Sequence, residues 1–283
     1  MSKKEKKPRE YRGLVDEIRE QQKKLKDMTW KQRFEWFFEY YKFHTLAVIV
    51  GIFVLISIIN TVINHKDNCF YAILLNAASV DSEIMEESFA EYAGMDTEKY
   101  ECFIDTSSTL SYITPSNMDY ATMEKIMAVT QTKDLDVGVF DSQAFRQYAV
   151  TQVFQDLRNV LSPEQLERYQ DYIYYIDKAD IDFINSDEYD GNDPNSTANI
   201  YDMELVYEEA RKHAHPENMK EPIPVGIYLT ESALYKSGIA YQDLIPIYGV
   251  GVTTTRPEAA AQFLDYLFDE SIPYLDMLAN YWG

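Results

Sequence analysis

Polar residues at the expected carboxyl ends of strand-like segments are the groups of this sequence best placed to bind a ligand. In open α/β sheets, ligands bind in the crevice beyond the carboxyl ends of the strands. Hydroxyl, amide and carboxylate groups there could hold a small molecule by hydrogen bonds, although each residue is equally suited to cap a helix or close a turn. The candidate ligand-binding residues are Asn76, Ser79, Thr106, Ser107, Asp141, Ser142 and Thr230.

Aromatic side chains offer a second kind of contact. The chain holds 23 tyrosines, and exposed rings such as those of Tyr112, Tyr172 or Tyr174 could stack on a sugar. The same rings could instead belong to the core or to a strand face.

Cys69 and Cys102 are the two cysteines of the chain. Each lies near the start of an expected strand, 70–76 and 100–105, and consecutive strands of an α/β fold are often neighbours. A disulfide between them is one interpretation. Two buried free thiols are the other, because the sequence does not give the Cα separation on which a disulfide depends.

Metal ligands are a weaker prospect. The acidic segment 177–193 holds seven Asp or Glu residues, and such clusters can bind calcium. Counted from Asp180, however, the sixth position is Asn185, where the calcium-loop template has glycine. His213 and His215 lie two residues apart, which is not the spacing of a helical metal pair. We expect a solvated acidic loop, surface histidines, no metal site and no cofactor.

Catalytic signatures are absent from the sequence. It contains no G-x-S-x-G serine elbow, no phosphate-binding G-x-x-x-x-G-K and no G-x-G-x-x-G. Residues 64–283 hold 13 Lys or Arg against 39 Asp or Glu, a net charge of −26. This charge argues against nucleic-acid binding by that region. We therefore expect a protein that is not an enzyme and does not bind nucleic acid.

The uncharged segment 45–63 separates this acidic region from a basic one. Residues 1–44 hold 13 Lys or Arg and 8 Asp or Glu, a net charge of +5. A helix of this uncharged length spans about 28 Å, close to the hydrocarbon thickness of a bilayer. The apolar run is too long for a cleaved signal peptide, and no small-x-small site follows it. Because basic flanks stay in the cytoplasm, we expect one transmembrane helix, a cytoplasmic N-terminus and an extracytoplasmic domain, 66–283.

Two segments precede the expected span. Residues 1–28 combine a basic arm with a short amphipathic helix, which is either a partner helix in a coiled coil or a solvated juxtamembrane helix. Residues 29–44 are rich in aromatic side chains mixed with basic ones. That composition predicts a helix at the membrane–water interface.

Beyond the span, strand-like and helix-like segments alternate. This pattern predicts an α/β domain with a mostly parallel central sheet. The expected strands are 70–76, 100–105, 134–140, 172–176, 224–229 and 247–252.

The order of these segments resembles that of extracellular solute-binding proteins, of the type 2 periplasmic-binding-protein-like class. The resemblance rests on the strands FYAILLN, YECFID and DLDVGVFD with helices between them, followed by FQDLRNVLSPEQL. Later, PVGIYLTES and YGVGVTTTRPEAAAQFLDYLF resemble the family's C-terminal pattern. Together they cover roughly residues 70–280. Only 177–220 stands where most of the family's second lobe would be, which implies a reduced second lobe or an insert.

These observations together predict a membrane-anchored, extracytoplasmic solute-binding-like protein of a bacterial cell envelope. It would bind a small solute or a peptide, or act as an interaction module with an envelope protein partner. The alternative is a membrane-tethered sensor or assembly protein that signals through its cytoplasmic helix. Specific ligand binding by the isolated outer domain would favour the first; loss of function on deleting 1–28 would favour the second.

Overall fold

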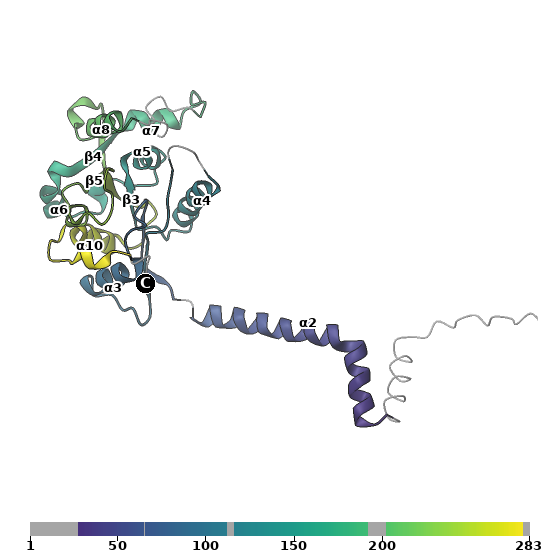
Figure 1. Ribbon diagram of the computed structural model, residues 1–283. Coiled ribbons are helices and arrows are strands. Elements are labelled where there is room, and N and C mark those ends of the chain that lie inside the picture. The colour runs from purple at the N-terminus through teal and green to yellow at the C-terminus, as the bar shows by residue number, and fades with distance from the viewer. Residues whose placement is uncertain (1–27, 65, 112–115, 192–201, 280–283) are drawn as a thin grey trace, which may run out of the picture. The chain divides into compact units, whose positions relative to one another are not determined.

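The protein was studied as a computed structural model that describes residues 28–64, 66–111, 116–191 and 202–279 (Figure 1). Two units are present, Met1–His65 and Lys66–Gly283. The amphipathic helix expected within residues 1–28 lies outside the described residues.

One helix, α2, accounts for the described part of the first unit. It runs from Trp30 to Asn64 and bends sharply along its length (Figure 1). Residues 30–44 of the aromatic segment and the whole apolar segment 45–63 lie within it. Within it, Tyr41–Asn60 has a mean hydropathy of 2.3 and no buried residues. By length and composition this stretch could cross a membrane, and it is the one such helix among the described residues.

The second unit is built on a mixed sheet. The described strands form one six-stranded sheet in the order β2-β1-β3-β6-β5-β4. β1 pairs in parallel with β2 and β3, whereas the pairs β3–β6, β5–β6 and β4–β5 are antiparallel. The strands are β1 (Asn68–Leu74), β2 (Glu101–Asp105), β3 (Val137–Asp141), β4 (Ile173–Asp177), β5 (Pro222–Tyr228) and β6 (Pro246–Val250).

The expectation of an α/β fold is therefore confirmed, but that of a mostly parallel sheet is wrong. Helices α3 and α4 carry the chain back between β1, β2 and β3, which makes these three strands parallel. After β4, each strand pairs with the next one along the chain and reverses direction. In the sequence, a helix that joins two parallel strands looks the same as a helix that joins two antiparallel strands. The alternation of strands and helices therefore did not reveal the strand directions.

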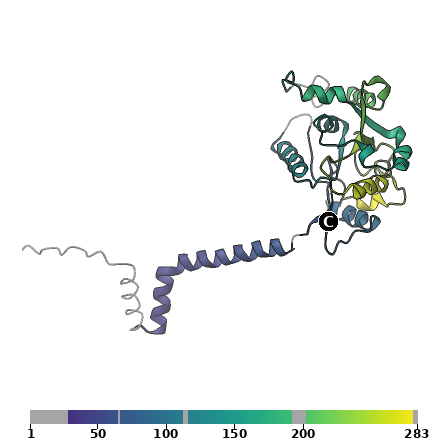
Figure 2. The same cartoon turned by 180° about the vertical axis from the view of Figure 1, so that it is seen from behind.

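Helices cover both faces of the sheet, as Figures 1 and 2 show. On β1, Phe70, Ala72 and Leu74 pack with α3 (Ser82–Tyr92) and α10 (Pro257–Phe268). The alternate residues Tyr71 and Ile73 pack with α4 (Asn117–Gln131) and α5 (Ser142–Val150). This alternation is the period of two that a strand buried on both faces requires.

Short helices complete the unit. The segment 177–220 contains α7 and α8, which contact α5 and lie within the same compact unit as the sheet. The described residues of this segment do not form a separate, reduced second lobe. The elements not yet given are α6 (Pro163–Arg168), α7 (Lys178–Ile184), α8 (Met203–Lys212), α9 (Ala233–Ser237), η1 (Leu157–Asn159), η2 (Gln170–Tyr172), η3 (Pro216–Asn218) and η4 (Tyr274–Met277).

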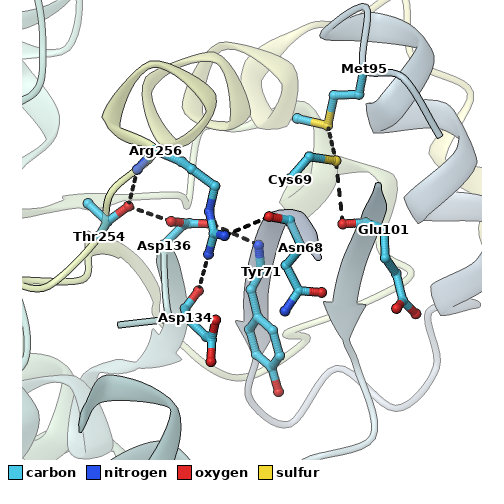
Figure 3. A network of polar contacts seen from close by, with 9 residues as sticks. All are labelled: Asn68, Cys69, Tyr71, Met95, Glu101, Asp134, Asp136, Thr254 and Arg256. Carbon is cyan, nitrogen blue, oxygen red and sulfur yellow. Dashed lines mark hydrogen bonds and ion pairs between the residues drawn. The ribbon is translucent and has the colours of Figure 1, made fainter. Parts of the chain in front are cut away.

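A buried ion pair connects the amino ends of β1 and β3 to the turn before α10 (Figure 3). The Arg256 Nε lies 2.7 Å from Asp136 Oδ2. The other two guanidinium nitrogens donate to the carbonyl oxygens of Asn68 and Asp134, each at 2.7 Å. Asp136 also accepts hydrogen bonds from the Tyr71 amide at 2.8 Å and from the Thr254 hydroxyl. One arginine thus holds together three segments that are distant in the sequence.

Candidate functional site

Asn76 and Asp141, each predicted at the carboxyl end of a strand, lie side by side in the structure. Asn76 follows β1 with a φ of +63°, a left-handed conformation that asparagine tolerates. Its Nδ2 donates to Asp141 Oδ2 at 3.0 Å, and its Oδ1 accepts from the Leu110 amide at 2.9 Å. Asp141 also caps α5 through the amides of Gln143 and Ala144. The pair therefore joins strand ends and a helix start within the protein itself.

Asp105 organises the end of β2 in a similar way. Its Oδ1 accepts from the Ser107 amide at 2.9 Å and from the Ser107 hydroxyl at 2.7 Å. Its Oδ2 accepts from Lys125 Nζ at 2.8 Å and from the Ser108 hydroxyl. Burial opposes ionisation, but the hydrogen bonds from Lys125, Ser108 and Ser107 outweigh it and lower the pKa of Asp105. The neighbouring Thr106 hydroxyl is buried and donates to the Val80 carbonyl at 2.9 Å.

Ser79 and Ser142 also have structural roles. The Ser79 hydroxyl donates to the Ile239 carbonyl, and Ser142 is buried as the first residue of α5. Around β1, β2 and β3, the polar side chains predicted to face a ligand thus serve as caps, turns and cross-links. These described side chains therefore bond within the protein at this end of the sheet.

Thr230 is different, because it lines a pocket of about 460 Å³ at the β4–β5 end of the sheet. We call this cavity the tyrosine pocket. It is surrounded by four tyrosines, one threonine, one leucine, one isoleucine, two alanines and one charged residue of each sign. The lining residues are Asp171, Tyr172, Tyr207, Ala210, Arg211, Ala214, Tyr228, Thr230, Tyr235, Leu244 and Ile245.

The antiparallel pairing of β4 and β5 places the pocket where it is. Ile173 pairs with Ile227, so Tyr172, just before β4, comes close to Tyr228 at the end of β5. β5 runs in the same direction as β3, because each is antiparallel to β6. Thr230 therefore stands at the same sheet edge as Asp141, displaced from it by two strands.

Two of the tyrosines are fixed by hydrogen bonds to the pocket wall. The Tyr207 hydroxyl donates to the Asp243 carbonyl at 2.8 Å, and the Tyr228 hydroxyl donates to the Ala210 carbonyl of α8. Burial raises the pKa of both phenols, and for Tyr207 the carboxylate of Asp243 adds to the effect. Both hydroxyls therefore stay protonated at neutral pH, and their rings are held in place.

Other polar groups of the pocket have no partner in the protein. Within the described part of the chain, no hydrogen bond or ion pair engages the hydroxyls of Tyr172, Tyr235 and Thr230, the guanidinium of Arg211 or the carboxylate of Asp171. Three hydroxyls and two opposite charges thus converge on one cavity and remain available to a ligand. Small-molecule sites usually have this composition, with a few polar groups in a pocket that is mostly aromatic and aliphatic.

A second, more polar cavity of about 380 Å³ lies on the other side of α8. Four of its charged residues are paired: Arg146 lies 3.3 Å from Asp180, and Lys212 pairs with Glu209. His213 contacts the Tyr175 carbonyl through Nδ1 at 2.8 Å and stacks on Tyr174. Burial is the main cause that lowers the pKa of His213 to about 4, so this histidine is neutral at pH 7. It is part of the packing, not the surface residue expected from the sequence.

Cys69 and Cys102 are free thiols in the structure, so the disulfide interpretation has no counterpart in it. Cys102 is buried and pairs in register with Phe70. The Cys69 Sγ lies 3.4 Å from the Glu101 carbonyl and 3.5 Å from Met95 Sδ, as Figure 3 shows. Burial raises the pKa of both thiols, which makes them poor nucleophiles at neutral pH.

Among the described residues, no group of three or more His, Cys, Asp or Glu side chains is arranged to hold a metal ion. Part of the acidic segment 177–193 lies outside those residues. Of the acids described there, Asp177 accepts hydrogen bonds from the amides of Ala179, Lys220 and Glu221. These contacts give it a structural role.

Sequence reasoning named two residues of the tyrosine pocket and missed the rest. Tyr172 and Thr230 were candidates; Tyr174 is fully buried against Phe145 and His213, and Tyr112 lies outside the described residues. Tyr207 and Arg211 come from α8, a helix in which the sequence analysis named no candidate residue. A signal for the pocket would have needed the antiparallel pairing of β4 and β5, which the sequence did not provide.

Comparison with known proteins adds little to this description. No protein-family model matches the chain, and no curated protein matches it. Among solved structures, one weak neighbour is a periplasmic binding protein, AttC of Agrobacterium tumefaciens strain C58, in an open unliganded conformation. The two sequences are 12% identical, the TM-score is 0.28, and the match covers 72% of this chain and 79% of AttC. A likeness at this level does not decide fold or function.

Proposed function

We propose that the chain is a membrane-anchored, extracytoplasmic solute-binding-like protein that holds a small solute or a peptide in the tyrosine pocket and catalyses no reaction. One observation supports this proposal above all others. Five polar side chains without a partner in the described protein converge on a single cavity at the edge of the sheet. Tyr172, Thr230 and Tyr235 are half-buried, whereas Asp171 and Arg211 are exposed. A half-buried hydroxyl without a partner costs free energy, so a ligand that bonds to these three hydroxyls would be stabilised.

The size and composition of the cavity favour a small ligand. Pockets for small molecules measure about 300–1,000 Å³ and combine apolar walls with a few polar groups. At about 460 Å³, the tyrosine pocket falls in the lower half of that range. The tyrosine rings form large rigid walls. Thr230 and the two charged residues offer hydrogen bonds that would orient a ligand.

The membrane part of the proposal rests on α2 and on the charges beside it. Tyr41–Asn60 could span a bilayer, the residues before it are basic, and the domain after it is strongly acidic. Basic flanks remain in the cytoplasm, so the domain that carries the pocket would face outwards, at a bacterial cell envelope.

The chemistry of the pocket supports a binding role without catalysis. No histidine and no cysteine is found among its described lining residues. The phenols of Tyr207 and Tyr228 have raised pKa values, so near pH 7 they stay protonated and cannot accept a proton as general bases.

A thermal-shift screen of residues 66–283 tests the proposal. Both clusters of buried hydrophobic residues lie wholly inside this unit, so it has its own core. The panel contains sugars, amino acids, short peptides and calcium, and a ligand at 100 times its dissociation constant adds about 2.7 kcal/mol to the unfolding free energy. We expect a solute or a peptide to raise the unfolding temperature. A cooperative transition that no compound shifts would contradict solute binding and leave the envelope interaction module.

A further inference from the structure

Resting on the proposed function, the geometry points to a neutral saccharide, a mono- or disaccharide, as the ligand of the tyrosine pocket. Three features carry this inference: fixed aromatic walls, hydroxyl groups without partners, and one acid balanced by one base. Each of them excludes or disfavours other classes of solute.

The aromatic walls suit the flat apolar faces of a sugar ring. Tyr207 and Tyr228 are each anchored through the hydroxyl to a backbone carbonyl, Asp243 and Ala210 respectively. Tyr172 packs against Phe268, with ring centroids 5.9 Å apart. Rings held in this way need little reordering when a ligand arrives, which reduces the entropic cost of binding.

The hydroxyl groups suit a ligand that both donates and accepts hydrogen bonds. Tyr172, Tyr235 and Thr230 each bring a hydroxyl that bonds to nothing in the described protein. A hydroxyl donates one hydrogen bond and accepts others. The hydroxyls of a sugar have the same double capacity, so they can satisfy all three positions without a particular pattern of protonation.

The charges favour a ligand with no net charge. Asp171 and Arg211 are the charged residues among those that line the pocket, and their charges cancel. An anion would be repelled by the acidic domain, whose region 64–283 carries a net charge of −26. A cation would be drawn to the tyrosine rings but would meet the unpaired guanidinium of Arg211. A carboxylate and a guanidinium can instead accept from and donate to neighbouring sugar hydroxyls.

Isothermal titration calorimetry of the full chain tests the inference. The protein is kept in a detergent without a sugar headgroup, because such headgroups would compete for the pocket. The titrants are maltose, cellobiose, galactose and N-acetylglucosamine, with glycine betaine and a set of amino acids as the competing classes. Two near-isosteric variants, Tyr235→Phe and Thr230→Val, each remove one hydroxyl. Tyr120→Phe on α4, at a tyrosine that is 57% exposed and outside the pocket, is the matched control.

We expect at least one saccharide to bind and each pocket variant to weaken it roughly fivefold, the value of one net hydrogen bond, while Tyr120→Phe leaves the affinity unchanged. Circular-dichroism melting confirms that all three variants are folded. Saccharide binding that neither pocket variant weakens would overturn the inference. Binding of betaine or an amino acid in place of every saccharide would overturn it while leaving solute binding intact. Absence of binding by all titrants would contradict the inference, whereas a peptide that raises the unfolding temperature in the thermal-shift screen would still support the proposed function.

Discussion

The ion pair between Asp136 and Arg256 makes a quantitative prediction about stability. The Asp136 side chain is fully buried and that of Arg256 is 20% exposed. Burial raises the pKa of Asp136, against the opposing contacts of Thr254, Arg256 and the Tyr71 amide. Asp136→Asn keeps the shape of the side chain but removes the charge. It also replaces one carboxylate oxygen, which accepts hydrogen bonds, by an amide nitrogen, which donates them. That nitrogen would face the donor groups of Arg256, Thr254 or Tyr71.

Removing one partner of a buried ion pair costs about 3–5 kcal/mol, because the other charge is left uncompensated. For a domain of this size, that cost lowers the unfolding temperature by about 10 °C. Urea and thermal unfolding of residues 66–283, followed by circular dichroism, measure both quantities. The matched control is Glu221→Gln, since Glu221 and its partner Lys178 are 65% and 46% exposed. Exposed pairs contribute at most about 1 kcal/mol.

A double-mutant cycle separates the pair from other effects of the substitutions. Arg256→Gln alone should also be strongly destabilising, because Asp136 would keep a buried charge. The double variant Asp136→Asn/Arg256→Gln should lose less than the sum of the two single losses, by at least about 1 kcal/mol. If Asp136→Asn unfolds within about 1 kcal/mol of the wild type, or if the two losses simply add, the ion pair does not connect the segments as described.

Three further predictions concern pH, packing and topology. The pKa of His213 is about 4 in the folded protein against 6.5 for the free side chain, so the unfolded state binds the proton better and stability falls as pH drops below about 6.5. Between pH 7 and pH 5, His213→Gln should therefore lose about 2 kcal/mol less unfolding free energy than the wild type in urea titrations. Gly251→Ala would place a Cβ 2.2 Å from the Leu135 carbonyl oxygen, and chemical denaturation should show a loss of about 2 kcal/mol. With both native cysteines replaced by alanine, a cysteine at exposed Glu164 should react with a membrane-impermeant maleimide from outside intact cells; labelling only after lysis would refute the topology.

Strand positions could be predicted from the sequence because they follow local rules. β1 was expected at 70–76 and runs from Asn68 to Leu74, since a continuous apolar run between polar residues suits a strand buried on both faces. The α/β class follows from the same alternation of segments. The direction of β4, β5 and β6 does not, because helices α7 and α8 in the β4–β5 connection look in sequence like helices that cross a sheet.

The candidate site was predicted less well, for a related reason. Asn76 and Asp141 were correctly expected at strand ends that meet, but polar residues at strand ends can bond to one another as readily as to a ligand. There they do so. The tyrosine pocket, by contrast, is assembled from four separate segments around Thr230. The sequence shows where the tyrosines are, but not that they line one pocket. That depends on the pairing of β4 with β5.

Hydrogen–deuterium exchange of the full chain, with and without the solute that gives the largest thermal shift, tests the central claim most directly. Ligand binding slows exchange where it suppresses local opening. Binding in the tyrosine pocket should protect the segments that line it: 171–172, 207–214, 228–235 and 244–245. Protection confined to the carboxyl ends of β1, β2 and β3 would contradict this account, because it would place the ligand at strand ends whose described polar side chains bond within the protein.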